Sequence, residues 1–225
     1  MLSRTDRDRY VQALREGARS IGIDVTPELA QALATHHALV VKWAQKINLT
    51  TVTEPERAAS IHGLDSLLFA ELFDGEDPAE VIDVGSGAGF PGLVLALARP
   101  RLAVRLWEPQ RKRASFLHVA LAELGRADVR VEERRLERVR ADRSAPLETT
   151  CIVSRATIPP LELVEIAPRY LRPEGRLILS GGAGLPALEE LLRAAPGALR
   201  AERTLDVELP GGEPRVLHLL RRTSA

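Results

Sequence analysis

The sequence predicts an α/β fold, in which a mostly parallel sheet of seven strands follows a helical N-terminal extension and ends in an antiparallel hairpin. Three observations support this fold class. Apolar residues recur at helical spacing through about the first seventy residues. Short apolar runs then alternate with amphipathic stretches, the pattern of a parallel sheet covered by helices on both faces. The last two apolar runs flank a turn rich in glycine and proline, which is typical of a hairpin.

The N-terminal part, residues 1–75, is expected to be a helical extension that packs on a core formed by residues 76–225. Its helical pattern covers residues 6–72. Within it, Thr26 followed by Pro27 is typical of an N-cap with proline at the first helical position.

The core alternates strands and helices. The predicted strands are the short apolar runs 80–84, 103–107, 129–132, 150–154, 176–180, 202–209 and 215–220. The predicted helices between them are 92–98, 110–124, 160–171 and 185–195. A parallel sheet that is finished by an antiparallel hairpin is the arrangement of class I methyltransferases.

Composition limits the function without deciding it. The chain has 225 residues, 45% of them hydrophobic and 28% charged, which predicts a soluble globular protein. Its formal net charge is zero, so a nucleic-acid partner would have to meet a local basic patch. Cys151 is the only cysteine, and we expect no disulfide, no metal site and a reducing, cytoplasmic location. No apolar run is long enough to cross a bilayer, so we expect no membrane partner.

A glycine-rich turn follows the first predicted strand. Gly85, Gly87 and Gly89 follow the strand, and Gly92 opens the next helix. Glycines at such a turn let the backbone approach a bound ligand, and the helix start offers free N–H groups. The spacing G-x-G-x-x-G from Gly87 matches dinucleotide sites, whereas G-x-G-x-G from Gly85 is the commoner methyltransferase form.

Two carboxylates near the turn favour S-adenosylmethionine (SAM) over NAD. Asp83 precedes the glycines, where a negative charge suits the ammonium and sulfonium cations of SAM and gains little from a pyrophosphate. Glu108 ends the next strand and can accept the ribose hydroxyls of either ligand. Taken singly, Asp83 could instead cap a helix and Glu108 could be a solvated strand end. An NAD-linked oxidoreductase stays an alternative, although neither Tyr10 nor Tyr170 has a helical lysine partner for proton relay.

Several motifs occur in the order of one known family. They are Trp43 to Ser66, Asp83 to Gly92, Glu108 to Leu117, Arg135-Leu136-Glu137 and Ser154-Arg155-Ala156. Together they resemble the bacterial 16S ribosomal RNA guanine-N7 methyltransferases, also called the glucose-inhibited division protein B family.

The resemblance implies a Rossmann-like class I fold, SAM as cofactor, and 16S rRNA or the 30S particle as substrate. It implies that Gly85 and Phe90 line the SAM site. It also implies that Leu136 and Glu137 contact the adenine end of SAM. One departure is Ser180, since the family usually has lysine after the fifth strand.

The resemblance further implies that Arg155 lies between cofactor and substrate, and that Arg135 serves substrate binding or catalysis. The fourth predicted strand has no Asn/Asp-Pro-Pro-aromatic motif for an exocyclic amine, and Cys151 lies inside the strand, where a structural thiol is expected. Guanine N7 needs neither device, because it carries a lone pair and no proton. We expect Arg155 to orient the guanine, since arginine reads O6 and N7 and cannot act as a base.

The substrate is less well determined than the cofactor. Basic residues cluster at 111–113 and 130–143, and they are either an RNA contact or a solvated helix face. Methylation of a small molecule or a protein, and RNA binding without catalysis, stay open. We expect the protein to act as a monomer.

Overall fold

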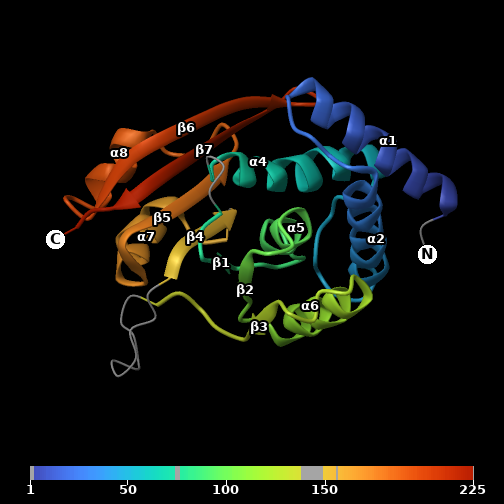
Figure 1. Cartoon of the computed structure of the whole chain (residues 1–225), viewed down its shortest axis with the longest axis horizontal. Helices are drawn as coiled ribbons and strands as arrows, with labels where there is room; N and C mark the ends of the chain where they lie inside the picture. The colour runs from blue at the N-terminus through green and yellow to red at the C-terminus, as the bar shows by residue number, and fades with distance from the viewer. Residues whose placement is uncertain (1–2, 74–76, 138–148, 156, 225) are drawn as a thin grey trace.

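The sheet has the predicted strands in the order β3-β2-β1-β4-β5-β7-β6 (Figure 1). The structure is a computed structural model, and it describes residues 3–73, 77–137, 149–155 and 157–224. Its strands are β1 Glu80–Val84, β2 Ala103–Trp107, β3 Arg130–Glu132, β4 Thr149–Arg155, β5 Leu171–Gly181, β6 Leu199–Leu209 and β7 Glu213–Arg222. Strands β1 to β5 run parallel, and β7 is antiparallel to both β5 and β6.

The strand order reverses between β1 and β4. From β1 the chain builds outward to β2 and β3, then returns to place β4 on the other side of β1. The connections diverge at this point, so the carboxyl ends of β1 and β4 border a crevice where ligands of open parallel sheets bind.

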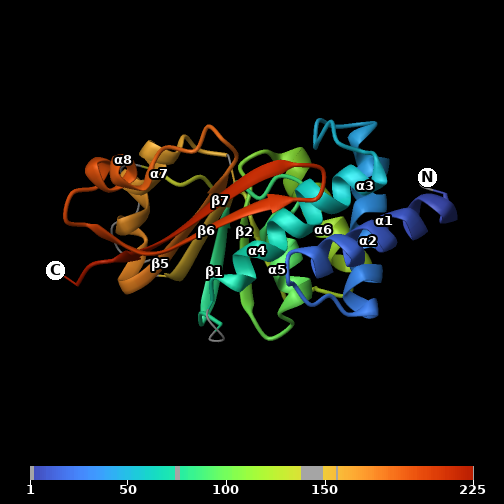
Figure 2. The ribbon, with the colours of Figure 1, turned by 90° about the horizontal axis from the view of Figure 1, so that it is seen from above.

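Two layers of helices cover the sheet. The helices are α1 Arg4–Ser20, α2 Pro27–Ala44, α3 Pro55–Ala58, α4 Asp65–Glu71, α5 Gly92–Ala98, α6 Arg111–Glu123, α7 Pro160–Ile166 and α8 Leu188–Ala194. Helices α1 to α6 lie on one face, and α7 and α8 lie on the other (Figure 2).

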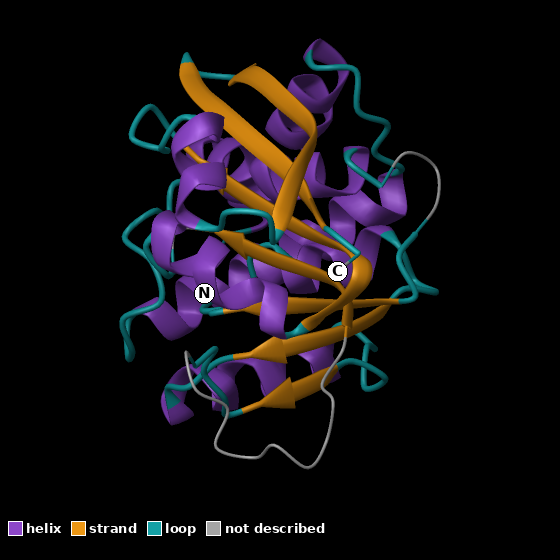
Figure 3. Cartoon of the chain, turned by 90° about the vertical axis from the view of Figure 1, so that its left-hand side faces the viewer, coloured by secondary structure: helices purple, strands orange, loops and turns teal. Residues whose placement is uncertain are grey.

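Alternate residues of each buried strand face these two layers. Val81 and Val153 belong to the apolar cluster under α1 to α6, whereas Ile82 and Ile152 belong to the cluster under α7 and α8. This period of two is what a strand buried on both faces requires. The strands twist progressively across the sheet (Figure 3).

The N-terminal helices share one apolar cluster with the sheet. Tyr10 and Leu14 of α1 and Leu33 of α2 are buried together with Leu106 of β2. The N-terminal helices are therefore buried against the sheet. The division at residue 75 stays a prediction, and that residue lies outside the described part of the chain.

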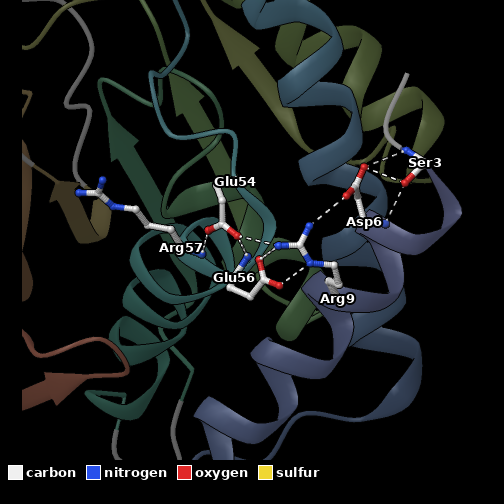
Figure 4. Close-up of polar contacts among 6 residues, drawn as sticks. All are labelled: Ser3, Asp6, Arg9, Glu54, Glu56 and Arg57. Carbon is white, nitrogen blue, oxygen red and sulfur yellow. Dashed lines mark hydrogen bonds and ion pairs between the residues drawn. The ribbon is translucent and has the colours of Figure 1, made fainter.

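The start of α1 is held by local polar contacts. Ser3 and Asp6 form a capping box, in which each side chain bonds the backbone N–H of the other residue. Arg9 then reaches Glu54, the N-cap of α3, and Glu56 within α3, with Nε 2.6 Å from Glu56 Oε1 (Figure 4). These exposed ion pairs connect α1 to a segment that lies 45 to 47 residues further along the chain, and each contributes little to stability on its own.

Two local features differ from the sequence prediction. Residues Ala59–Leu64 form a π-helix between α3 and α4, which no periodicity indicated. The helix predicted over 160–171 ends at Ile166 and is followed by a 3₁₀ turn at Ala167–Arg169. Pro168 has no N–H to continue the helix, and Leu171 instead pairs with β4 as the first residue of β5.

Candidate active site

The glycine-rich turn lies at the carboxyl end of β1, as predicted. Gly85 and Gly87 have φ values of 76° and 56°, which only glycine adopts without strain. A Cβ on Gly85 would lie 2.0 Å from Cγ2 of Thr157, whereas one on Gly87 would meet no atom closer than 3.8 Å. Gly85 therefore allows the β4 loop to approach, and Gly87 faces open space.

Glu108 holds the turn from the neighbouring strand. It is buried, and its two carboxylate oxygens accept hydrogen bonds from the backbone N–H groups of Gly87, at 2.9 Å, and Gln110, at 2.8 Å. Glu108 is thus at the edge of the turn, where a ribose would have to displace or share these N–H donors. Its role as a cofactor ligand stays a prediction.

Asp83 and Gly89 lie behind the turn. Asp83 is fully buried, and its Oδ2 accepts from the N–H of Gly92 at the start of α5, 2.9 Å away. Burial raises the pKa of Asp83 to about 7, against the lowering effect of that N–H. A Cβ on Gly89 would come 2.9 Å from Cβ of Leu93. These contacts describe helix capping and close packing, and the direct cofactor contacts predicted for Asp83 and Gly89 stay predictions.

Phe90 is held between two histidines. Its ring stacks on the ring of His62, with centroids 4.5 Å apart. The ring of His36 is tilted against it, with centroids 4.9 Å apart. His36 Nε2 is also 2.8 Å from the carbonyl of Ala88, so α2 contacts the turn directly. The guanidinium of Arg155 lies 5.1 Å from the Phe90 centroid, a cation–π distance.

Asp65 joins the ends of three strands. Its Oδ2 is 3.2 Å from Nη1 of Arg155 in β4 and 3.4 Å from Nε of Arg215 in β7. Its Oδ1 accepts from the hydroxyl of Ser180 in β5 at 3.2 Å. Asp65 is 2% exposed, and Arg215 also pairs with a second carboxylate, since its Nη2 is 3.3 Å from Oε2 of Glu213. The two guanidinium groups are therefore held in place by Asp65 and Glu213.

His62 completes the setting of Arg155. Its Nδ1 is 3.3 Å from Arg155 Nη2, and its Nε2 is 3.0 Å from the hydroxyl of Thr50. Because Arg155 can only donate, we assign the proton to Nε2. Burial, helped by the charge of Arg155, lowers the pKa of His62 to about 3, so the ring is neutral at pH 7.

Three of the cavities at the strand ends are lined by predicted site residues. The β2–β3 cavity, of about 340 Å³, is lined by Val84, Gly85, Pro109, Gln110, Arg134, Arg135, Leu136, Thr157, Ile158, Pro159 and Glu162. The glycine-turn cavity, of about 360 Å³, is lined by Leu49, Thr50, His62, Gly85, Ser86, Gly87, Ala88, Phe90, Arg113, Arg155 and Thr157. The Asp65 cavity, of about 310 Å³, is lined by Ile61, His62, Asp65, Arg155, Ser180, Gly181, Gly182 and Arg215.

The cavities share lining residues. Gly85 and Thr157 line both the β2–β3 cavity and the glycine-turn cavity, and Arg155 lines both the glycine-turn cavity and the Asp65 cavity. A ligand that enters along the β2–β3 cavity therefore reaches the two others at Thr157 and Arg155. A larger space, about 600 Å³ between α1 and the β6–β7 turn, contains none of the predicted site residues.

The structure brings the other predicted residues to the β2–β3 cavity. Leu136 and Arg135 line it directly. The backbone of Glu137 is fixed beside it, since its N–H donates to the hydroxyl of Tyr170 at 3.1 Å. The basic residues at positions 138, 140 and 143, expected to form either an RNA contact or a solvated helix face, lie outside the described residues.

Sequence reasoning missed two residues of the site. Thr157 donates its hydroxyl hydrogen bond to the carbonyl of Gly85, 3.0 Å away, and lines two of the three cavities. Arg215 enters the site because β7 lies antiparallel beside β5, with Val216 opposite Gly181. The only sequence feature that could have indicated a place for Arg215 in the site was the predicted hairpin, because its second strand brings the chain back to the end of β5.

The residues at the strand ends fit SAM. Gly87 leaves open space beside the turn, Leu136 gives one cavity an apolar wall, and the buried carboxylate of Glu108 lies between them in the sheet. Within the described ranges, no group of three or more His, Cys, Asp or Glu side chains is placed to hold a metal ion. No helix among the described residues is long and apolar enough to span a bilayer.

Solved structures with the same fold include SAM-dependent methyltransferases. A SAM dependent methyltransferase from Aquifex aeolicus superposes with a TM-score of 0.53 at 18% identity, over 71% of this chain and 90% of that chain. A SAM-dependent O-methyltransferase from Thermotoga maritima gives 0.54 at 15% identity, over 83% and 72%. At these identities the likeness concerns the fold, and it confirms the predicted class I architecture.

Curated relatives are much closer in sequence. The ribosomal RNA small subunit methyltransferase G of Myxococcus xanthus is 34% identical over 213 residues, which are 94% of this chain and 97% of the relative. The ribosomal RNA small subunit methyltransferase G 1 of Syntrophobacter fumaroxidans is 37% identical over 213 residues, 93% and 96% of the two chains. The family model described as rRNA small subunit methyltransferase G matches residues 29–195. The chain therefore belongs to the rRNA small subunit methyltransferase G family, as its motifs predicted.

Proposed function

We propose that this protein transfers the methyl group of SAM to N7 of a guanine in 16S ribosomal RNA. Membership of the family confirms the predicted enzyme class, a methyltransferase, and its cofactor, SAM. The proposal adds the part played by the residues around the strand ends.

The Asp65 cavity is the observation that carries the proposal. Arg155 and Arg215 point to one carboxylate from two different strands, and both side chains keep some exposure, 19% and 16%. Guanine presents O6 and N7 as two acceptors on one edge, and arginine is the side chain that most often donates to this edge. Guanidinium groups with N–H donors left for a ligand also suit a neighbouring phosphate.

Methylation at N7 requires position more than proton transfer. N7 carries an in-plane lone pair and no proton, so no base is needed. The site agrees with this, because His62 has a pKa near 3 and Arg155 stays protonated. When bound, SAM supplies a methyl group activated by its sulfonium. The work of this chain is then to hold the guanine so that N7, and not O6, faces the methyl group.

Residue roles follow from the cavities as part of the proposal. The β2–β3 cavity would take adenosine, with Glu108 near the ribose and Leu136 and Glu137 near the adenine. Gly85, Gly87 and Phe90 would border the rest of the cofactor, with Asp83 and Gly89 supporting the turn from behind.

Two arginines complete the proposed roles. Arg155 would contact both the cofactor and the guanine, since it lines two cavities. Arg135 would meet RNA at the mouth of the β2–β3 cavity, where its side chain is exposed.

The RNA would have to expose the guanine. Guanine N7 lies in the deep, narrow major groove of A-form RNA, so a loop or a partly assembled small ribosomal subunit is the proposed substrate. The proposed place of action is the cytoplasm, and the protein would act as a monomer.

Methyl transfer to RNA tests the proposal. Purified protein and tritiated SAM are incubated with 30S particles from cells that lack the modification, and N7-methylguanosine is mapped in the 16S rRNA. We expect one modified guanine. Arg155→Ala should lose transfer by at least about a hundredfold and still bind S-adenosylhomocysteine. Arg19→Ala, an exposed change on α1, is the matched control. Normal transfer by Arg155→Ala, or methylation of only a small molecule or protein, would refute the proposal.

A further inference from the structure

We infer that Arg113 binds the carboxylate of the methionine portion of SAM, inside the glycine-turn cavity. The inference rests on SAM being the cofactor. It assigns a ligand-binding role to a residue of α6 that neither the glycine turn nor the strand ends indicate.

The two cavities beside Gly85 differ in chemistry. The β2–β3 cavity offers apolar and amide groups from Pro109, Gln110 and Leu136, which suit a flat adenine ring, and its charged lining contains both signs (Arg134, Arg135 and Glu162). The glycine-turn cavity is lined mostly by the turn backbone and by two cationic side chains, Arg113 and Arg155. A ligand that places its adenosine in the first cavity extends past Gly85 into the second.

The charge of the glycine-turn cavity is not balanced from within. Among the described residues that line it, none is an aspartate or a glutamate, and His62 is neutral. Arg155 is partly neutralised by Asp65, which lines only the neighbouring cavity. Arg113 has no such carboxylate partner among the ion pairs of the described chain. A ligand carboxylate would supply the missing negative charge.

The guanidinium of Arg113 is already held in one orientation. Its Nε and Nη2 donate to the carbonyl of Asn48 at 3.1 and 2.9 Å. These two bonds use two of its five N–H donors and leave others for a ligand. A guanidinium that is fixed before binding loses less conformational entropy when the anion arrives.

This placement also orients the rest of the cofactor. With the carboxylate end at Arg113 and adenosine in the β2–β3 cavity, the middle of the ligand lies near Thr157 and Arg155, where the cavities join. That position borders the Asp65 cavity, which is the proposed guanine site.

Two ligands that differ at the carboxylate end test the inference. Binding of S-adenosylhomocysteine and of 5′-methylthioadenosine, which lacks the amino-acid group, is measured by calorimetry. We expect Arg113→Gln to weaken S-adenosylhomocysteine about tenfold or more and to leave 5′-methylthioadenosine within about twofold. Arg113→Lys should restore part of the loss. Lys112→Gln, an exposed change on the same helical turn, should change neither affinity.

Thermal unfolding checks that the Arg113→Gln protein is folded. Equal loss of both ligands, or no loss of S-adenosylhomocysteine, would overturn the inference. A rise only in the KM for ribosomal RNA would also overturn it, because it would assign Arg113 to a phosphate. If the unaltered protein bound neither nucleoside, the proposed cofactor itself would be wrong, and the inference with it.

Discussion

The proposed cofactor half of the site, around the glycine turn, and the proposed substrate half, around Asp65, are held together by different kinds of contact. In the cofactor half, Gly92 donates to Asp83 nine residues away, and Gly87 donates to Glu108 twenty-one residues away. In the substrate half, Arg155 meets Asp65 across 90 residues, and Ser180 meets it across 115. The first set lies within one strand–helix–strand unit, and the second joins α4 to three separate strands.

This difference has a consequence for stability and for specificity. In the cofactor half, both oxygens of Glu108 and Oδ2 of Asp83 accept from backbone N–H groups, which any sequence with the same turn would supply. The substrate half depends on side chains that pair only after the whole sheet is ordered. Changes to Asp65 should therefore damage folding and methyl transfer together, whereas changes to the turn should act mainly on cofactor binding.

Asp65→Asn should have the largest effect. It removes the carboxylate between two guanidinium groups, and loss of one partner of a buried ion pair costs about 3–4 kcal/mol of unfolding free energy. Chemical denaturation measures this loss. Methyl transfer should fall by more than the affinity for S-adenosylhomocysteine, measured by calorimetry. Equal losses of methyl transfer and of S-adenosylhomocysteine affinity would mean that Asp65 does not act mainly in the substrate half.

Acid should destabilise the protein through its buried histidines. Burial lowers the pKa of both His36 and His37 to about 4, from 6.5, so the unfolded chain binds more protons between these values. Stability is then complete above pH 6.5 and falls as the pH drops toward 4, by about 3 kcal/mol for each histidine. The raised pKa of Asp83 has the opposite effect, because it increases stability as the pH falls. The contribution of a histidine is therefore measured by comparing a variant that lacks it with the unaltered protein.

The two histidines also separate packing from cofactor binding. His36 bonds the carbonyl of Ala88 in the turn, whereas His37 stacks on Tyr10 at 4.8 Å. His36→Phe and His37→Phe should each flatten the dependence of unfolding free energy on pH from 4 to 6.5. Only His36→Phe should weaken S-adenosylhomocysteine, and His36→Gln, which keeps a donor, should restore part of the affinity. If both phenylalanine variants weakened S-adenosylhomocysteine equally, the contact between His36 and the glycine turn would not be what supports cofactor binding.

Gly85→Ala should act on the cofactor half. The residue has φ of 76°, and the added Cβ would press on Thr157, with a combined cost of about 2 kcal/mol. Gly125 has φ of 67° with no atom within 4 Å of the added Cβ, so Gly125→Ala is a matched control for the backbone term. Calorimetry should show lost S-adenosylhomocysteine affinity for Gly85→Ala alone. Unchanged affinity would place the ligand away from the turn.

Ser180→Ala should have the smallest effect. It removes one hydrogen bond to Asp65 Oδ1 and leaves both ion pairs, a cost of about 1 kcal/mol. Ser154→Ala, which removes the hydroxyl bond to the carbonyl of Val84, is a buried control of similar cost. Transfer should stay within about threefold of the unaltered rate for both. A large loss for Ser180→Ala alone would mean that this hydroxyl, at the family's usual lysine position, meets the substrate.

Some of the site could be read from the sequence because its signals are local. The strand, the turn from Gly85 to Gly92 and Glu108 at the next strand end follow from apolar periodicity and glycine spacing, and the structure has them where they were expected. The apolar alternation also determined the seven strands and the closing hairpin, with boundaries that moved by a few residues. The motifs along the chain further determined the family.

Only the tertiary structure decided which distant side chains meet. Asp65, Arg155 and Arg215 lie on α4, β4 and β7, and nothing in their sequence neighbourhoods indicates that one carboxylate serves two arginines. Likewise, only the structure shows that Oδ2 of Asp83 accepts from the first N–H of α5, while the predicted contact of this carboxylate with a cation of the ligand stays a prediction. Periodicity and residue spacing in the sequence indicate only contacts between residues that are close along the chain. A pairing across the sheet depends on strand order and on the packing of the N-terminal helices, which exist only once the chain has folded.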